Sequence, residues 1–353
     1  MSAPDVAVIG GGIAGCATAA FVAEGGATVT VYEREAVAAG ASGRNSGIVQ
    51  HPMDEALAGL YERSLALYAT LGHGFELPAE VGGVLLVSQN REALARDFEA
   101  ARDRFPELAP QWLEGDALRA EEPALAAGIC AYRLDTGRPI GPTAATRAWE
   151  ARARAAGARF EIGCEVRAGE LSAGAVVVAA GPWTPVALGA RADWRPVYAN
   201  WGVVAQVRLP QPPRYALEQA EIEALTAPGG AAGSLFSLVT TRGASAVGST
   251  FSADRPDAAA AAPSVLEHAA RYVPALAGAR IEQLRACARP LSADGRPLLG
   301  AVADGVYLVT GHGAWGVTLG PASAEAVART VLGEAGAIAP ELAAARFGDP
   351  CAG

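Results

Sequence analysis

The chain has 353 residues, of which 51% are hydrophobic and 18% charged, so we expect one large or two interlocked globular units rather than disorder. Its net charge of −9 argues against nucleic acid or an anionic membrane as the main partner, because basic patches bind both. All 28 basic residues are arginine, and the absence of lysine excludes Schiff-base catalysis and a Walker-type phosphate loop.

The first 33 residues have the pattern of a strand–helix–strand unit. Residues 5–9 form a short apolar run that is typical of a buried parallel strand. GGGIAG follows at 10–15, and a helix of small residues runs from there to Gly25. Residues 27–33 are a second predicted strand, which ends in an acid. The whole unit has about the ~30-residue length of a dinucleotide-binding motif.

The glycines of this unit have separate physical tasks. Gly10 permits the tight turn after the strand, Gly12 lets the backbone approach a pyrophosphate, and Gly15 allows close helix–strand packing. Glu33, 18 residues after Gly15, can accept hydrogen bonds from a ribose diol, and Arg34 beside it could cover an adenine ring. The sequence therefore predicts dinucleotide binding, but this motif alone does not separate FAD from NAD.

The rest of the chain alternates predicted helices and strands. Residues 36–50 lack periodicity and are expected to form a loop, as are residues 253–263. Apolar spacing and capping signals predict helices at 54–71, 91–104, 142–156, 264–272 and 323–333. Strands are expected at 81–88, 158–162 and 173–181, in two alternating stretches at 196–209 and 234–251, and at the start of 306–321, before a glycine-rich turn.

The five cysteines are scattered and form no C-x-x-C pair, which predicts neither a disulfide framework nor a metal site. This pattern is typical of a reducing compartment. The first strand is expected to begin by Asp5, which leaves no room for a signal peptide. No apolar run approaches the ~20 residues that span a bilayer. We therefore expect a cytoplasmic protein without a membrane span.

Three further stretches identify a family. They are GASGRNSG at 40–47, VVVAAGPWT at 176–184, and ARPLSADGRPLLG at 288–300 with the glycine-rich segment 311–328. In this order the chain resembles the D-amino-acid-oxidase-like superfamily of flavoenzymes, of the glycine oxidase and sarcosine oxidase type. The resemblance covers nearly the whole chain, although 85–135 and 195–285 match only loosely. It implies that the cofactor is FAD.

The resemblance also implies an α/β fold in which an FAD-binding Rossmann-like domain carries an inserted antiparallel-sheet substrate domain. On this basis we expect a discontinuous FAD-binding domain made of residues 1–80, 139–194 and 286–353. The substrate-binding domain is then made of residues 81–138 and 195–285.

Residues that match the family's cofactor motifs are expected to contact FAD. The pyrophosphate would lie against Gly10, Gly12, Ile13, Ala14 and Gly15, and against the turn of Ala180, Gly181 and Trp183. The ribityl chain and flavin ring would be lined by Ser42, Gly43, Arg44, Asn45, Ser46 and Gly47. The pyrimidine edge would be held by Gly311, His312, Gly313, Ala314, Trp315 and Gly316, with a helix N-terminus stabilising negative charge on the reduced ring. The backbone of Val166, in a strand expected after 158–162, would meet the adenine, and Glu33 the ribose.

Simpler interpretations stay open for some of these positions. Ser42 and Ser46 could serve as loop hydrogen bonders, and Asn45 could satisfy backbone groups within its turn. Trp183 and Trp315 could be core aromatics.

Arg289 is the best candidate substrate contact. It stands in a segment that resembles one of glycine oxidase in which the arginine pairs with the substrate carboxylate, a bidentate geometry that fixes orientation. The alternative is an internal ion pair. His51 and Tyr198 are further active-site candidates, with structural roles as their alternatives, and Trp201 and Tyr215 are possible pocket walls.

Two features bear on the cofactor and on the electron acceptor. Cys287 lies seven residues before Asp294, the spacing at which sarcosine-oxidase-like relatives attach a cysteine to the flavin, whereas glycine oxidases bind FAD without a covalent bond. The sarcosine oxidase lysine that helps activate oxygen has no counterpart here. O2 and another electron acceptor therefore both stay open.

The predicted function is the oxidation of a C–N bond in a small amino acid or secondary amine, by hydride transfer to flavin N5. Such chemistry requires positioning more than acid–base groups. One alternative is an FAD-dependent 2-hydroxy-acid dehydrogenase, because residues 44–49 also resemble the flavin loop of 2-hydroxyglutarate dehydrogenases. The other is a flavoprotein of a biosynthetic pathway that acts on a larger amine.

Overall fold

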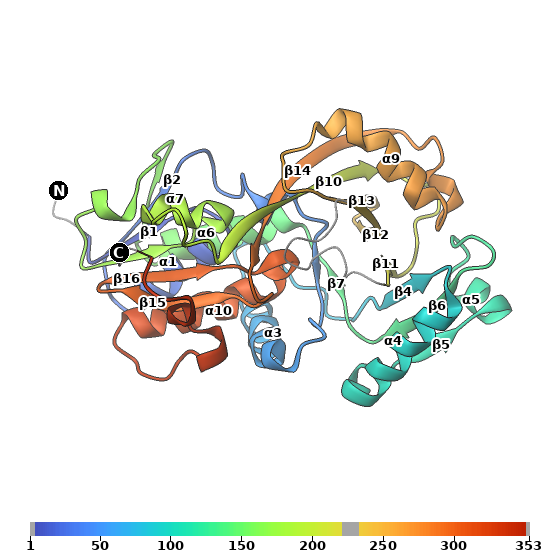
Figure 1. The fold of residues 1–353 in the computed structure, drawn as a ribbon, viewed down its shortest axis with the longest axis horizontal. Helices are drawn as coiled ribbons and strands as arrows, with labels where there is room; N and C mark the ends of the chain where they lie inside the picture. Colours follow the sequence, from blue (N-terminus) through green and yellow to red (C-terminus); the bar gives the residue numbers. More distant parts are fainter. Residues whose placement is uncertain (1–3, 221–232, 351–353) are drawn as a thin grey trace.

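A computed structural model describes residues 4–220 and 233–350. Its first layer is a six-stranded sheet with the order β15-β16-β9-β1-β2-β8 (Figure 1). All neighbours in it are parallel except β15 and β16. Its strands are β1 (Val6–Ile9), β2 (Val29–Glu33), β8 (Arg159–Ile162), β9 (Ala175–Val178), β15 (Leu298–Ala303) and β16 (Val306–Thr310).

Helices and loops bury both faces of this sheet. Val6 and Val8 of β1 point into a core that is completed by the helices, whereas Ala7 and Ile9 point into a second core on the opposite face. This alternation follows from the two-residue period of a strand, and it explains why β1 is apolar throughout. The helices of the first core are α1 (Ile13–Glu24), α3 (Glu55–Ala69), α6 (Pro142–Ala155) and α10 (Gly316–Val331).

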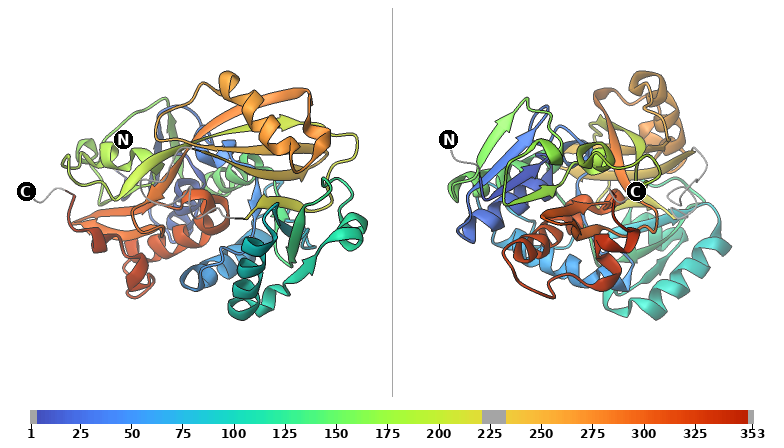
Figure 2. Two further views of the ribbon diagram at one scale, coloured as in Figure 1. Left: turned by 45° about the vertical axis from the view of Figure 1, so that its right-hand side comes forward. Right: turned by 60° about the vertical axis from the view of Figure 1, so that its left-hand side comes forward.

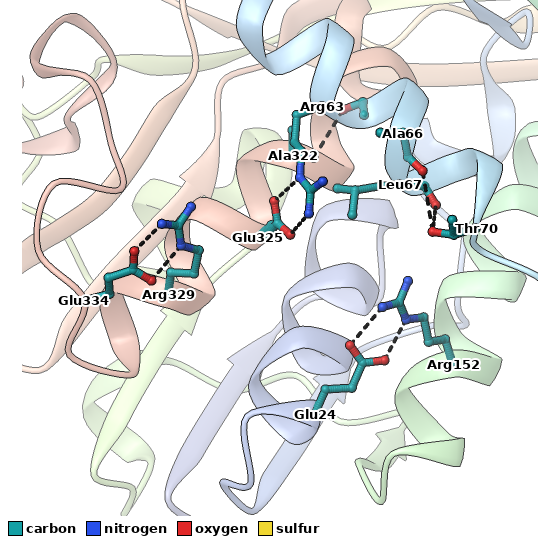
Figure 3. A network of polar contacts seen from close by, with 11 residues as sticks. Glu24, Arg63, Ala66, Leu67, Thr70, Arg152, Ala322, Glu325, Arg329 and Glu334 are labelled. Carbon is teal, nitrogen blue, oxygen red and sulfur yellow. Dashed lines mark hydrogen bonds and ion pairs between the residues drawn. The ribbon is translucent and has the colours of Figure 1, made fainter.

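Ion pairs join these helices at the surface (Figure 3). The guanidinium of Arg152 on α6 donates to the Glu24 carboxylate on α1 at 2.6 and 2.9 Å. Arg63 on α3 donates through Nε to Glu325 on α10 at 2.7 Å. Both pairs are bidentate, which fixes how the helices are turned relative to each other.

The second layer is an eight-stranded, mostly antiparallel sheet with the order β14-β10-β13-β12-β11-β4-β6-β5. Its strands are β4 (Val84–Ser88), β5 (Gln111–Leu113), β6 (Cys130–Leu134), β10 (Val197–Val207), β11 (Ala216–Gln219), β12 (Gly233–Thr241), β13 (Ala244–Phe251) and β14 (Ile281–Ser292). The outer face packs against α9 (Ala258–Ala270), and α4 (Arg91–Arg104) and α5 (Gly115–Glu121) cover the end with β4, β5 and β6 (Figure 1). Along β4, Leu85 and Val87 belong to the core under α9, whereas Val84 and Leu86 line a cleft on the other face.

The strands β10 and β14 connect the two layers. They pair from Val197↔Ser292 to Val207↔Ile281. Figure 2 shows the pair passing from the first layer into the second in both further views. Strand β14 continues through residue 286, where the sequence predicts a change of domain. Shorter elements at this junction are α2 (Ala41–Arg44), α7 (Thr184–Leu188) and the two-stranded ribbon of β3 (Ile48–Val49) and β7 (Arg138–Pro139).

The predicted fold class is confirmed, and so are the helices expected at 54–71, 91–104 and 142–156. The loop expected at 253–263 is wrong, because α9 already begins at Ala258. Asp257 caps it by accepting from the backbone N–H of Ala259 at 2.9 Å, and the alanines that follow are strong helix formers.

Two other boundaries also differ from the expectation. Residues 36–50 contain the short helix α2 and strand β3 instead of a continuous loop. The helix expected at 323–333 begins earlier, at Gly316, because the glycine-rich turn ends there and not at Pro321. None of the helices in the described ranges is long and apolar enough to cross a membrane.

The close packing of α1 against the turn after β1 and the residue after β9 yields a stability prediction. A Cβ on Gly15 would overlap the carbonyl oxygen of Gly10 and lie 3.2 Å from the Cβ of Ala179. We expect Gly15→Ala to lower the free energy of unfolding by about 2 kcal/mol, measured by urea denaturation. Gly59→Ala is the control, because its position on α3 has no atom within 4 Å. It should raise that free energy by roughly 0.5–1 kcal/mol, and equal effects of both variants would contradict this packing.

Candidate active site

In the turn after β1, the backbone at Gly10 packs closely against the backbone at Ala179. Gly10 has a φ of +110°, and a Cβ there would lie 2.6 Å from the carbonyl oxygen of Ala179. Gly12 caps α1, and the backbone N–H of Ile13 donates to Ser42 Oγ at 3.0 Å. The free N–H groups at the start of α1 therefore face the cleft, which makes this turn a site for phosphate.

Glu33 fixes the glycine turn from the end of β2. Its carboxylate accepts from the backbone N–H of Gly11 at 2.7 Å and from that of Glu35 at 2.8 Å. A carboxylate has about four acceptor positions, so capacity for a ribose diol is left. Glu33 lines the cleft.

Arg34 and Trp183 meet above this end of the cleft. The guanidinium carbon of Arg34 lies 4.0 Å from the centre of the Trp183 ring, in a cation–π contact. Val166 lies nearby on the cleft wall, although the strand expected to carry it is absent: the backbone after β8 is irregular there. Glycine at 163, with a φ of +80°, ends β8 before that residue.

The segment 40–47 folds tightly beside α6. The Asn45 side chain donates to the Ala41 carbonyl at 2.8 Å and accepts from the backbone N–H of Gly47 at 2.8 Å. Asn45 therefore satisfies backbone groups of its own turn, the simpler of its two interpretations. Arg44 reaches across to β14, where its Nη1 donates to the Ala286 carbonyl at 3.4 Å.

The turn before α10 contains the most deeply buried histidine of the cleft. Gly311 and Gly313, with φ values of +78° and +54°, flank His312, which is 5% exposed. Burial lowers the pKa of His312 to about 4, so the ring is neutral at pH 7. Its Nε2 has no hydrogen-bond partner among the described residues. An unpartnered polar atom beside a helix N-terminus fits a polar, electron-accepting ring in the cleft.

These segments border one continuous cleft of about 1470 Å³. That volume exceeds the roughly 300–1,000 Å³ of ordinary ligand pockets, so a dinucleotide and a small second molecule fit together. The cleft brings together most of the cofactor residues expected from the sequence. They are Gly10, Gly12, Ile13, Ala14, Glu33, Arg34, Ser42, Arg44, Asn45, Ser46, Gly47, Val166, Ala180, Gly181, Trp183, His312, Gly313, Ala314, Trp315 and Gly316. Gly15, Gly43 and Gly311 lie outside its lining and act through packing or turn geometry.

Arg289 lies on β14 at the other end of the cleft and is 9% exposed. Its Nη1 donates to Asn200 Oδ1 at 3.3 Å and to the Thr250 carbonyl at 3.2 Å, and its Nη2 donates to Ser249 Oγ. Gly202 leaves the room it needs, because a Cβ there would lie 2.7 Å from the guanidinium carbon.

No carboxylate neutralises Arg289 in the described part of the chain. Burial lowers its pKa, and only the neighbouring Cys287 opposes that shift. The internal ion pair considered as an alternative is therefore not found among residues 4–220 and 233–350. Arginine stays protonated in proteins, so the cleft contains a buried cation whose charge no anion compensates.

The two other catalytic candidates differ in position. His51 lines the cleft, but its ring packs 5.3 Å from Tyr61 and 5.1 Å from Phe105, and its Nδ1 accepts from the backbone N–H of Met53 at 3.2 Å. Burial lowers its pKa. These contacts favour its structural alternative. Tyr198 on β10 is not among the residues that line the cleft, and neither is Tyr215. Trp201 does line it.

Gln50 and Glu218 are among the polar residues of the cleft that the sequence did not predict. Gln50 Nε2 donates to both carboxylate oxygens of Glu218 at 3.0 Å. The available signals were weak: Gln50 directly follows the flavin-loop segment, and Glu218 is a charge inside the β-pattern of residues 215–219.

Comparisons with known proteins agree with this geometry. The family model of the FAD-dependent oxidoreductases named DAO matches residues 5–330. The glycine oxidase of Geobacillus kaustophilus is 28% identical over 360 residues, which cover 93% of this chain and 92% of that protein.

Two solved structures show the same fold. The crystal structure of glycine oxidase from Geobacillus kaustophilus superposes with a TM-score of 0.84 at 24% identity, covering 98% of this chain and 99% of the other. Iminodiacetate oxidase from Chelativorans sp. BNC1 superposes with a TM-score of 0.78 at 23% identity, covering 98% and 100%. The chain belongs to the DAO family of FAD-dependent oxidoreductases, and its cofactor is FAD.

Proposed function

We propose that the enzyme oxidises the C–N bond of a small amino acid or secondary amine that carries a carboxylate. The buried, uncompensated guanidinium of Arg289 is the observation that supports this proposal most strongly. A substrate carboxylate supplies the missing anion and accepts two parallel hydrogen bonds, which also sets its orientation. The relatives named as glycine oxidase and iminodiacetate oxidase act on substrates of this class.

The residues around the cleft have distinct roles in this proposal. FAD, when bound, supplies the acceptor for the hydride that leaves the substrate α-carbon. The start of α1 would hold its pyrophosphate, Glu33 its ribose, and the 40–47 segment and the turn around His312 its ring, because residues of each of these parts line the cleft. His312 is neutral at pH 7, so the N-terminus of α10, rather than a charged imidazole, would stabilise negative charge on the ring. The chain's own contribution to catalysis is mainly to position the substrate.

Arg289→Met tests the substrate contact. We expect it to raise the KM for carboxylated amines by about 10- to 100-fold, the loss that matches one or two charge-assisted hydrogen bonds, while FAD content stays unchanged. The measurement is the anaerobic bleaching of the flavin band by glycine, sarcosine, D-alanine, D-proline and 2-hydroxyglutarate.

Arg208→Met is the matched control, because Arg208 pairs with Glu282 at 3.2 Å outside the cleft. It should leave the kinetics unchanged. Unaltered kinetics in Arg289→Met would remove Arg289 from the substrate site. Bleaching by the hydroxy acid alone would replace the amine proposal with the 2-hydroxy-acid dehydrogenase.

Trp183→Ala tests the adenosine end of the site. We propose that the stacked Arg34 and Trp183 cover this end of FAD, so the variant should raise the Kd for FAD about 5-fold, or roughly 1 kcal/mol. The Kd is read from flavin fluorescence quenching as FAD is added back to depleted protein. Trp112→Ala is the control, because the Trp112 ring lies 5.5 Å from the guanidinium carbon of Arg91 and does not line the cleft. Equal effects of the two variants would contradict the proposed cover.

Cys287 lines the cleft, and we propose that it does not carry the flavin. Burial raises the pKa of its thiol, which keeps the reactive thiolate scarce. Acid precipitation of the holoenzyme should therefore release all flavin into the supernatant. A yellow pellet from wild type that turns white in Cys287→Ser would show covalent attachment instead.

The cytoplasmic location also stays a proposal. The free thiols of Cys16, Cys130, Cys164 and Cys287 support it.

A further inference from the structure

The wall of the cleft contains a carboxylate that the proposed function has not yet used. Glu218 on β11 accepts from Gln50 Nε2 through both oxygens at 3.0 Å. Gln50 is 7% exposed, and its Oε1 has no hydrogen-bond partner among the described residues. Both side chains line the cleft. A buried acceptor without a donor, beside a carboxylate, is the half-site for a ligand that donates hydrogen bonds.

Gln50 brings this half-site next to the expected flavin ring. It follows β3 directly, and its backbone N–H donates to Thr318 Oγ1 at 3.4 Å near the start of α10. Thr318 lines the cleft together with Gly316, which belongs to the flavin-edge turn. Glu218 is therefore held by a residue that itself contacts the cofactor region.

Glu218 and Arg289 share one wall. Glu218 pairs with Ser237 of β12, and Ser237 pairs with Gly248 of β13. The next residue, Ser249, binds the Arg289 guanidinium. Two strand spacings, about 10 Å, thus separate Glu218 from the point where that guanidinium is held. This span fits a small molecule with a carboxylate and an amine a few bonds apart and one hydrogen bond at each end.

Glu218 and Arg289 each lack a partner of opposite charge among the described residues. Glu218 is partly covered, and the protein around it raises its pKa through burial, with only the amide of Gln50 acting in the opposite direction. No arginine or histidine pairs with it in residues 4–220 and 233–350. A carboxyl group without a cationic partner and a guanidinium without an anionic partner thus line the same cavity. A dipolar ligand that carries both charges satisfies them together.

We propose that Glu218, oriented by Gln50, binds the amino group of the substrate and accepts its ammonium proton. In this step an N–H bond breaks, the electron pair stays on nitrogen, and the proton moves to a carboxylate oxygen of Glu218. Atoms and charge balance without an oxidant, and the product is the neutral amine whose lone pair assists C–H cleavage. This inference rests on the proposed function and deepens it, because it assigns recognition of the amine as well as of the carboxylate. A hydroxy acid has no ammonium to meet Glu218.

Binding of two unreactive ligands to the holoenzyme tests the inference. 2-Aminoisobutyrate has no α-hydrogen to lose, and pivalate replaces its ammonium with a methyl group. Perturbation of the flavin absorption band reports the Kd of each. We expect Glu218→Gln to raise the Kd of 2-aminoisobutyrate about 10-fold or more and to change the Kd of pivalate less than about 2-fold. Only the first ligand loses a charge-assisted hydrogen bond in this variant. Arg289→Met should weaken both ligands.

Two further variants control for folding. Glu121→Gln makes the same substitution at a carboxylate that accepts from the Tyr215 hydroxyl at 2.7 Å outside the cleft, and it should change neither Kd. Gln50→Leu leaves the Glu218 carboxylate in place but removes the amide that orients it. It should also raise the Kd of 2-aminoisobutyrate more than that of pivalate, but less than Glu218→Gln does, so the result does not depend on one variant.

A kinetic measurement separates proton acceptance from binding alone. With saturating amine, anaerobic flavin bleaching should be at least about 10-fold slower in Glu218→Gln at pH 7. The deficit should shrink as the pH approaches the pKa of the amine, because solution then supplies neutral substrate. The titratable or charged groups around this wall include Tyr132, whose pKa is raised by burial and then by Asp97 and Glu218, and also His51, Cys287, Arg255 and Arg289. These groups are present in both wild type and Glu218→Gln, so the difference between their two pH profiles isolates Glu218.

The possible failures are distinguishable. If no amine bleaches the wild-type flavin, the proposed function is wrong. If amines bleach it but Glu218→Gln binds 2-aminoisobutyrate and reacts as the wild type does, Glu218 is not the amine contact. Wild type that binds pivalate but not 2-aminoisobutyrate would also overturn the inference.

Discussion

The guanidinium of Arg289 is buried between the β10–β14 pair and the ring of Phe251, whose centre lies 4.3 Å from its carbon atom. Removing such a charge from water costs several kcal/mol unless partners replace the solvent. Neutral acceptors and the aromatic face replace part of it, and glycine at position 202 gives the side chain its space. In our proposal, a substrate carboxylate at the far end of the cleft supplies the anion that this guanidinium lacks.

The cleft keeps this geometry because segments distant in sequence hold one another. The six-stranded sheet presents the start of α1 and the turn before α10, and the eight-stranded sheet presents Arg289 and Glu218. Strands β10 and β14 link these layers, and Arg44 binds the Ala286 carbonyl from the flavin segment. The cleft face of the eight-stranded sheet and the 40–47 segment are therefore held at a fixed distance from each other. A reaction between two bound molecules requires such fixed positions.

Membership in the DAO family establishes the cofactor and the class of chemistry, whereas the substrate is decided by a few side chains on the sheet wall. At 28% identity to a glycine oxidase, those side chains have to be considered one by one. An arginine alone does not separate amino acids from hydroxy acids. A carboxylate two strands away supplies that distinction in our proposal, and it does so without a lysine or a charged histidine.

The amino-acid sequence by itself determined the local units. The apolar run before GGGIAG, the acid at position 33 and the glycines around His312 are short-range patterns whose spacing is set by one turn or one strand. The family resemblance ordered these units around FAD and singled out Arg289. Asn45 could also be interpreted locally, because both partners of its side chain lie within its own turn.

Only the tertiary structure decided which side chains share the cleft. Tyr198 had the right residue type and a β-pattern, but it is not among the residues that line the cleft. The helix from Ala258 was mistaken for a loop because its cap and its packing under the sheet outweigh a proline at position 263. Nothing in the sequence indicated that Glu218 is a site residue, because its role depends on Gln50, which lies 168 positions away. It also depends on the pairing of strands across the sheet. Such contacts follow from the long-range pairing of strands and helices, which a local pattern does not encode.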